Sequence, residues 1–230
     1  MKILIYDKMQ DAADAPDAVK SPSLADIYEA ASTFNVTLSG MEKINCVGIG
    51  NTDATLLYIT NGVITRTISI TKSAPYQNGL YLFDEMYPAN EYGVSFTISH
   101  NGTYIGRVAI GEYRKLGCNP TMEMGFYSTN ENRTTLSGQE IPGAGGYTGR
   151  RFEADIRYKI TSEIYTDLEQ AYPLQIGKGF PFFLCLDDEQ HKLPTNMYYF
   201  YAKMDDPSLL LQSSTYAFKY SFKFSFYERF

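Results

Sequence analysis

Histidine and cysteine, whose side chains often act as bases, nucleophiles and metal ligands, are rare in this chain. Its 230 residues include two histidines, His100 and His191, and three cysteines, Cys46, Cys118 and Cys185. Cys185 and His191 are near each other in the sequence and would serve as nucleophile and base of a thiol enzyme if the fold brought them together. The cysteines are widely spaced, and no two of them form a C-x-x-C pair. This spacing argues against a disulfide framework or a zinc site. We therefore expect buried thiols in a reducing compartment, with His191 in an exposed polar loop.

An acidic run, Asp187-Asp188-Glu189, follows Cys185 and offers the oxygen ligands that hard cations prefer. Its spacing is not that of a calcium-binding loop, so we interpret it as a solvated turn. Neither histidine lies in the helical H-E-x-x-H pattern of a zinc protease. The sequence therefore predicts no metal ion and no cofactor.

A glycine-rich stretch, Gly143 to Gly149, has the composition of a nucleotide-binding loop but not its spacing. A dinucleotide fingerprint has glycine at the first, third and sixth places, and the sixth residue here is Thr148. The stretch also precedes a predicted strand, and no Lys-Ser or Lys-Thr follows it. We interpret it as a flexible connection. No G-x-S-x-G is present, whereas a pair of distant carboxylates for glycan cleavage would leave no local pattern.

The charge of the chain excludes one class of partner. The formal net charge is −6, and Arg150-Arg151 is a pair rather than part of a basic run. Binding to nucleic-acid phosphates requires a basic patch, so we expect no nucleic-acid partner. No run approaches the roughly 18 apolar residues of a spanning helix, and the first residues are too soon interrupted by charge for a secretory signal. We expect a soluble protein, made in a cytoplasm, with no membrane partner.

Aromatic residues are abundant and are limited to tyrosine and phenylalanine. The chain has 20 tyrosines and 14 phenylalanines but no tryptophan. Tyrosine is common both in sheet cores and at interfaces, where its ring packs and its hydroxyl stays hydrated. Exposed tyrosines on a β-sandwich can also stack on sugars, and the candidates are Tyr76, Tyr81, Tyr87 and Tyr92. A carbohydrate-binding module is therefore one alternative function, and a glycan-cleaving enzyme on a β-scaffold is another.

These residues must be positioned by strands, and the end of the chain shows this most clearly. Aromatic residues occupy every second position at Tyr216, Phe218, Tyr220, Phe222, Phe224 and Phe226. A strand places alternate side chains on one face, so this segment predicts a strand with one aromatic face. Leaving that face in water would cost roughly 25 cal/mol per Å². The rest of the fold or another subunit must cover it.

The first half predicts a series of short strands. They cover residues 1–6, 34–38, 45–50, 54–59, 63–71, 80–83, 93–99 and 104–112. Asn61-Gly62 and Asn101-Gly102 predict tight hairpins between the strands that flank them. Gly48 and Gly50 weaken a strand and predict a bulge or a close backbone contact. Short strands at this spacing are typical of a sandwich or a barrel.

In the second half, Cys118 to Tyr147 is poor in aliphatic residues and predicts a long loop that forms an interface or a functional site. Strands are expected at 152–160, 180–186, 197–202 and 209–230, and an apolar stripe with helical spacing predicts one short helix near 162–172. We expect an all-β fold, mainly an antiparallel β-sandwich of jelly-roll or galactose-binding-like type. Residues 1–115 would form one half, 116–150 a loop or assembly arm and 151–230 the second half, unless the whole chain is one continuous domain.

Several segments resemble a family of tailed-bacteriophage virion proteins. They are residues 45–55 (NCVGIGNTDAT), 101–107 (NGTYIGR), 111–117 (GEYRKLG), 133–146 (RTTLSGQEIPGAGG) and 212–214 (QSS), together with the terminal aromatic strand. The first half resembles, more loosely, a galactose-binding-like (discoidin-type) sandwich, although a fold alone does not transfer sugar binding.

The resemblance implies a non-enzymatic structural component of a phage tail, neck or baseplate. Such a protein is made in the host cytoplasm, resides in the virion and binds copies of itself and other virion proteins, with a surface glycan as the alternative partner. Arginine is favoured at interfaces and glycine lets two backbones approach closely. The resulting interface candidates are Arg133, Gly143, Gly145, Gly146, Arg150, Arg151 and Phe230.

Overall fold

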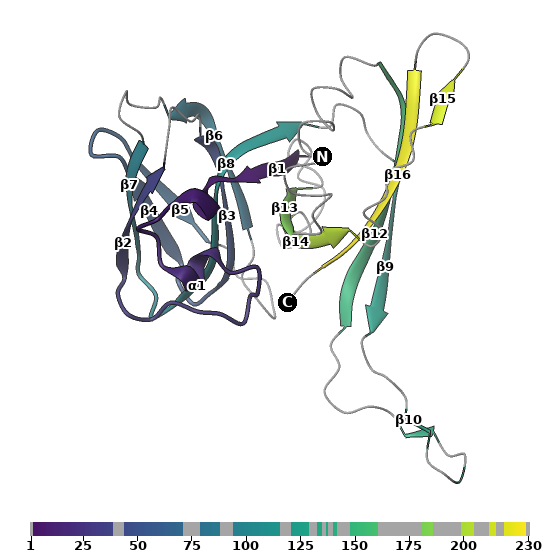
Figure 1. The fold of residues 1–230 in the computed structure, drawn as a ribbon, viewed down its shortest axis with the longest axis horizontal. Helices are drawn as coiled ribbons and strands as arrows, with labels where there is room; N and C mark the ends of the chain where they lie inside the picture. Colours follow the sequence, from purple (N-terminus) through teal and green to yellow (C-terminus); the bar gives the residue numbers. More distant parts are fainter. Residues whose placement is uncertain are drawn as a thin grey trace.

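The chain has an all-β fold, as the sequence predicts, in which strands form three antiparallel sheets (Figure 1). The computed structural model describes residues 2–38, 44–70, 79–87, 94–115, 121–128, 133–134, 137, 140–141, 148–160, 181–185, 199–204, 212–214 and 219–228. Within these ranges the helical elements are two single turns, η1 (Lys8–Asp11) and α1 (Asp17–Lys20). The helix expected near 162–172 lies outside the described residues.

The smaller of the two main sheets has four strands in the order β2-β7-β4-β5. Their bounds are β2 Thr33–Leu38, β7 Val94–His100, β4 Leu56–Thr60 and β5 Thr65–Ser69. Burial alternates along these strands, as it does in β2, where every second residue is buried. One face of the sheet is therefore apolar and the other is polar, which is the pattern expected of a sheet covered on one side.

The larger sheet has ten strands. The order is β6-β3-β8-β1-β13-β14-β16-β12-β9, with β15 also paired to β16. Their bounds are β6 Gly79–Tyr87, β3 Ile44–Thr52, β8 Ile105–Lys115, β1 Lys2–Asp7, β13 Phe182–Cys185, β14 Tyr199–Met204, β16 Lys219–Glu228, β12 Thr148–Ile160, β9 Thr121–Ser128 and β15 Gln212–Ser214. Because β1 pairs with both β8 and β13, backbone hydrogen bonds join the first half of the chain to the second.

The main core lies between the four-stranded sheet and the β3–β8 part of the larger sheet. It contains Val47 and Ile49 of β3, Val108 and Ile110 of β8, and apolar residues of all four strands of the smaller sheet. Met9, Ala12, Ala15 and Val19 of the N-terminal segment close one side of this core. The sandwich predicted for the first half is confirmed in this arrangement.

The opposite face of β3 is covered as well. Cys46 and Ala109 pack there with Phe183 and Cys185 of β13 and with Tyr201 of β14. A strand that is buried on both faces has a nearly continuous apolar sequence rather than an alternating one. Residues 44–50 have such a nearly continuous apolar sequence. Cys46 and Cys185 are both buried, as predicted, whereas Cys118 lies outside the described residues.

In the second half, β9, β12 and β16 run side by side as long antiparallel strands (Figure 1). A third, two-stranded sheet consists of β10 (Arg133–Thr134) and β11 (Glu140–Ile141). It lies away from the other two sheets, beyond the ends of β9 and β12 that face it (Figure 1). The predicted strand at residues 152–160 is confirmed and extends from Thr148 to Ile160.

Two sequence-based predictions were wrong in part. Asn101-Gly102 does not close a hairpin, because β7 belongs to the four-stranded sheet and β8 to the ten-stranded sheet. The turn instead carries the chain from one layer of the sandwich to the other. The expected long loop at 118–147 contains strand β9, in which Met122, Met124 and Phe126 alternate with more polar residues.

Candidate functional site

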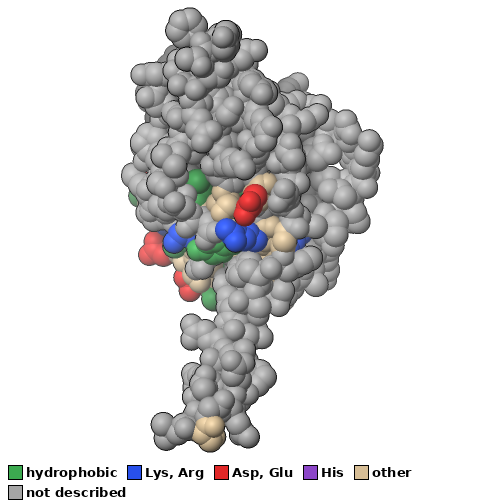
Figure 2. Space-filling model, turned by 90° about the vertical axis from the view of Figure 1, so that its right-hand side faces the viewer, with side chains coloured by type: hydrophobic (Ala, Val, Ile, Leu, Met, Phe, Trp, Pro, Cys, Tyr) green, Lys and Arg blue, Asp and Glu red, His purple; other side chains and the backbone are tan. Residues whose placement is uncertain are grey.

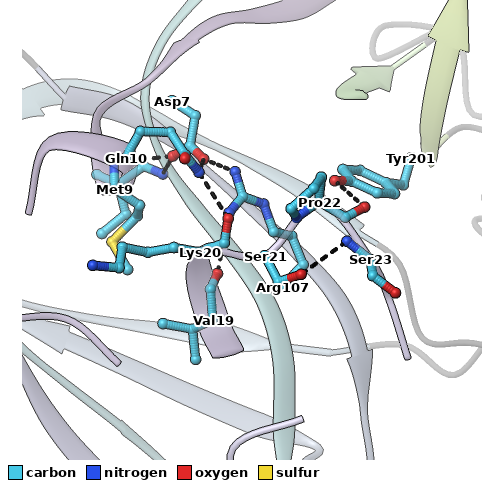
Figure 3. A network of polar contacts seen from close by, with 11 residues as sticks. Asp7, Met9, Gln10, Val19, Lys20, Ser21, Pro22, Ser23, Arg107 and Tyr201 are labelled. Carbon is cyan, nitrogen blue, oxygen red and sulfur yellow. Dashed lines mark hydrogen bonds and ion pairs between the residues drawn. The ribbon is translucent and has the colours of Figure 1, made fainter. Parts of the chain in front are cut away.

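A buried ion pair lies where the N-terminal segment, β8 and β14 meet (Figure 3). Arg107, near the start of β8, is only 4% exposed. Its Nη2 donates a hydrogen bond to Oδ2 of Asp7, and its Nη1 donates to the carbonyl oxygen of Val19 at 3.3 Å. The guanidinium thus connects a strand of the large sheet to the end of β1 and to the end of α1.

Asp7 is the last residue of β1 and caps the turn that follows it. Its Oδ1 accepts hydrogen bonds from the backbone N–H of Met9 at 3.0 Å and of Ile110 at 3.2 Å. Its Oδ2 accepts from Nε2 of Gln10 at 3.3 Å in addition to the bond from Arg107. Both carboxylate oxygens are therefore fully engaged by the protein, as a buried charge must be to repay its desolvation.

Tyr201 of β14 extends this network into the second half of the chain. Its hydroxyl donates a hydrogen bond to the carbonyl oxygen of Pro22 at 3.0 Å, and its ring packs on Phe183 with centroids 4.8 Å apart. Burial lowers the pKa of Arg107, and the neighbouring Tyr201 hydroxyl partly offsets this effect. The arrangement holds three segments together.

A second polar cluster holds the turn that joins the two sheets. Asp53, between β3 and β4, accepts hydrogen bonds from the backbone N–H of Thr103 at 2.9 Å and of Tyr104 at 3.1 Å. Burial acts to raise the pKa of Asp53, but hydrogen bonds from Thr103 and Tyr104 outweigh it and lower the pKa overall. Gly102 is required here, because a Cβ at this position would lie 2.2 Å from Oδ1 of Asp53.

Asn101 completes the same cluster from the other side. Its Oδ1 accepts from the N–H groups of Thr55 and Leu56, both at 2.9 Å, and its Nδ2 donates to Oγ1 of Thr55 at 2.8 Å. An asparagine in this place copies the hydrogen bonds of a backbone turn. The side chain thus fixes the start of β4 against the end of β7.

His100 lies directly before this turn and is buried. Burial lowers its pKa, and the carboxylate of Asp53 and backbone groups of Ala31 and Gly102 oppose that effect. The net direction is downward, so the imidazole is neutral at neutral pH. A neutral, buried histidine therefore lies next to a hydrogen-bonded aspartate.

Arg150, predicted as an interface residue, forms a two-pronged ion pair within the chain. Its Nε donates to Oε2 of Glu228 at 2.8 Å, and its Nη2 donates to Oε1 of the same carboxylate at 2.5 Å. The pair joins β12 to β16, and the Glu228 side chain is only 6% exposed. Such paired bonds are stronger and more directional than those of a single contact.

Arg151, the next residue, points to solvent instead. Its side chain is 47% exposed, and its Nη2 lies 3.7 Å from Oε1 of Glu153, which is also exposed. On this side of the molecule, basic and acidic side chains lie next to each other (Figure 2). A surface pair of this kind adds little to stability.

Of the remaining predicted site residues, three lie in the described part of the chain. Arg133 lies in β10 and Tyr87 at the end of β6, and Tyr81 is half-buried on β6 against the main core. The other candidates lie outside the described residues, and these are Gly143, Gly145, Gly146, Phe230, Tyr76 and Tyr92.

The two residues that a thiol enzyme would need, Cys185 and His191, are described only in part. Cys185 is buried in β13, whereas His191 and the acidic run at 187–189 lie outside the described residues. Among the residues that are described, no group of histidine, cysteine and acidic side chains has the arrangement of a metal site. No described helix is long and apolar enough to cross a membrane.

Comparison with known proteins gives no assignment. No family model, no curated protein and no solved structure matches this chain. The function is therefore argued from the geometry of the chain and from its sequence.

The residues that organise these clusters carry no local sequence signal. Asp7 and Arg107 are 100 positions apart in the sequence, and Asp53 and Thr103 are 50 positions apart. Only Asn101 lies in a segment that the sequence marks as a turn. The others become visible when the sheet brings β1, β3 and β8 together.

Proposed function

We propose that this chain is a non-enzymatic structural subunit of a larger assembly, and that the assembly is a phage particle, in its tail, neck or baseplate. It acts through contacts of β-surfaces and of an arm that carries the β10–β11 sheet. Its partners are copies of itself and other proteins of the particle. The phage assignment rests on the sequence segments that resemble virion proteins.

The observation that carries this proposal is the position of the β10–β11 sheet. This small sheet lies apart from the two large ones, past the point where β9 and β12 end (Figure 1). Two strands of two residues each bury too little surface to be stable alone. A neighbouring subunit would supply the missing contacts, in the way that peptide segments dock on folded partners.

The polar clusters support the same proposal from the other direction. The buried pair Asp7–Arg107, the Asp53 turn and the pair Arg150–Glu228 all use their hydrogen bonds to join elements of this chain. Residues used in this way give a rigid body, and a rigid body suits a subunit that must keep its shape during assembly.

The proposal is tested by removing the arm. The register brings Ser128 opposite Thr148, so residues 129–147 can be replaced by Asn-Gly as a two-residue hairpin turn. We expect the full chain to form defined oligomers or to join particles, measured by light scattering after gel filtration and by electron microscopy. The shortened chain should keep its circular dichroism spectrum and lose assembly.

The matched control is a charge reversal that leaves the length of the arm unchanged. Arg133→Glu keeps the arm but changes a charge on β10, and we expect it to weaken assembly less than the deletion does. A deletion variant that assembles as the full chain does would overturn the proposal. So would a full chain that stays monomeric while it turns over a polymer or small molecule.

A further inference from the structure

Among the described residues, no strand pairs with the outer edge of β5, whereas the N-terminal segment contacts the outer edge of the same sheet at β2. Two backbone hydrogen bonds flank the β4–β5 ladder and fix which backbone groups of β5 point toward β4. Ile70 N–H donates to Thr55 at 2.8 Å, and Asn61 N–H donates to Ile64 at 3.2 Å. Every second residue from Ile64 to Ile70 therefore bonds to β4.

The backbone groups of Thr65, Thr67 and Ser69 consequently point away from the sheet. Within the described part of the chain, no strand and no side chain bonds to their N–H or C=O groups. The side chains of all three residues are exposed. An edge strand of this kind is a template for another strand, and proteins usually block such edges.

The opposite edge of the sheet is blocked in this way. Thr37 of β2 donates its outward N–H to Oδ1 of Asp14 and its hydroxyl to Oδ2, both at 2.7 Å. Hydrogen bonds from Thr37 lower the pKa of Asp14 against the effect of burial, so the carboxylate remains charged in place. The N-terminal segment thus protects β2 from pairing, and β5 has no such protection among the described residues.

The sequence of β5 fits a second copy of itself. If Thr67 of one copy lies opposite Thr67 of another, Thr65 lies opposite Ser69 and Arg66 lies opposite Ile68. This register forms hydrogen-bonded pairs at every outward-pointing residue. It also pairs threonine and serine side chains across the exposed face, which is a favourable combination. The same sheet already contains a hydrogen bond between two threonine hydroxyls, from Thr65 to Thr60 at 3.0 Å. The two Arg66 charges do not lie directly opposite each other.

We infer that two copies of this chain join edge to edge through β5, antiparallel and centred on Thr67, to make one continuous sheet of eight strands. The occupant of the edge is therefore a second copy of this chain. The inference rests on the proposed function, because it names one contact through which the assembly forms. This contact uses the edge of β5, which is a different surface from the β10–β11 arm.

Cross-linking tests both the contact and its register. In a Cys118→Ser background, Cys46 and Cys185 are buried, so an introduced surface cysteine is the reactive one. Opposed residues of a hydrogen-bonded pair have Cα atoms about 5.5 Å apart, which a disulfide can bridge. We expect Thr67→Cys to give a covalent dimer of twice the 26.0 kDa chain mass under mild oxidation.

Thr65→Cys is the matched control. It presents the same residue on the same exposed face, but in this register the two copies of residue 65 are four positions out of line, or about 13 Å at 3.3 Å per residue. We expect at least a tenfold lower yield of covalent dimer. Equal cross-linking of the two variants, or none of either, would overturn the inference.

A second measurement does not depend on cysteine chemistry. Thr67→Pro removes the central outward N–H without removing a bond to β4, and Thr67→Lys opposes two positive charges at the same place. Both variants should halve the mass of the full chain's oligomer in sedimentation, whereas Thr33→Pro on the blocked edge should leave it unchanged. An oligomer that is insensitive to both Thr67 variants would refute the β5 contact, as would a full chain that is monomeric at near-millimolar concentration.

The two proposals fail in different ways. An assembly that is lost on deletion of the arm but indifferent to Thr67→Lys would support the proposed function and refute the β5 contact. A dimer that dissociates with Thr67→Lys but never grows or joins particles would support the β5 contact and refute the proposed function.

Discussion

Gly48 of β3 faces the ring of Phe183 of β13 so closely that a side chain has no room between them. A Cβ at residue 48 would lie 2.3 Å from Cδ2 of Phe183. The Phe183 side chain is only 1% exposed and packs against Tyr201. The glycine therefore lets a ring of the second half of the chain lie directly on the back of the first half's sheet.

We expect Gly48→Ala to destabilise the protein. The ring is enclosed and cannot move without disturbing its neighbours, so overpacking should cost about 1–3 kcal/mol of unfolding free energy. Chemical denaturation followed by circular dichroism would measure it. Gly125→Ala in β9 is the control, because a Cβ there meets nothing within 4 Å and the change removes the flexibility of glycine. A loss of stability in the control that equals the loss in Gly48→Ala would contradict this explanation.

Breaking the buried pair of Asp7 and Arg107 should be more costly. Asp7→Asn would leave the guanidinium buried without its counter-charge, for which the usual loss is about 3–5 kcal/mol. Arg107→Met should also destabilise, because it leaves the carboxylate of Asp7 without its cation. The double variant should be more stable than the sum of the two losses predicts. Additive losses would contradict a direct interaction. Asp17→Asn, at a fully exposed carboxylate that pairs with Lys20, should change stability little.

The strands could largely be predicted from the sequence, because alternation is a local property. Residues 34–38, 152–160 and the end of the chain alternate in polarity, and each forms a strand at the expected place. The strand β9 was missed because glycine and methionine weaken its pattern. Met122, Met124 and Phe126 nevertheless occupy every second position, which is the spacing of a strand.

The polar clusters could not be predicted, because they depend on which strands become neighbours. Nothing near Asp7 indicates that Arg107 will lie beside it, and strand order is not encoded in either segment alone. The turn at Asn101-Gly102 shows the same limit, since its residues correctly indicate a turn but not which sheet the chain enters next. The layers of the sandwich decide that, through the burial of β8 on both sides.

The stability of the fold should fall as the pH is lowered from 7 toward 5. Burial lowers the pKa of His100 in the folded chain below its ordinary value of 6.5. As the pH falls, His100 is therefore protonated in the unfolded chain before it is protonated in the folded chain. Protonation then favours the unfolded state across that range. His100→Gln should flatten this part of the pH profile, measured by urea denaturation at several pH values. A profile with the same slope in the variant would assign the effect to other groups.

A separate loss is expected in stronger acid. The pKa of Asp53 is lower in the folded chain than its ordinary value of 3.8, so its contribution is complete above that pH and disappears as the pH falls below it. Asp53→Asn should remove this acid-dependent part and lower stability at neutral pH, because the amide replaces a charged acceptor of the Thr103 and Tyr104 N–H groups. A variant that keeps the full acid-dependent loss would show that another carboxylate causes it.

The last strand should be indispensable, because it lies between two other strands of the large sheet. β16 pairs with β12 on one side and with β14 and β15 on the other, and its Phe226 is fully buried with its ring centroid 6.3 Å from that of Phe182. Phe226→Ala should cost about 3–5 kcal/mol, whereas Ser225→Ala, on the other face of the strand, should change little. Deletion of Tyr220 to Phe230 should give insoluble protein, because it uncovers the edges of β12 and β14 at the same time. A soluble truncated chain that still binds its partners would show that the rest of the sheet does not depend on β16.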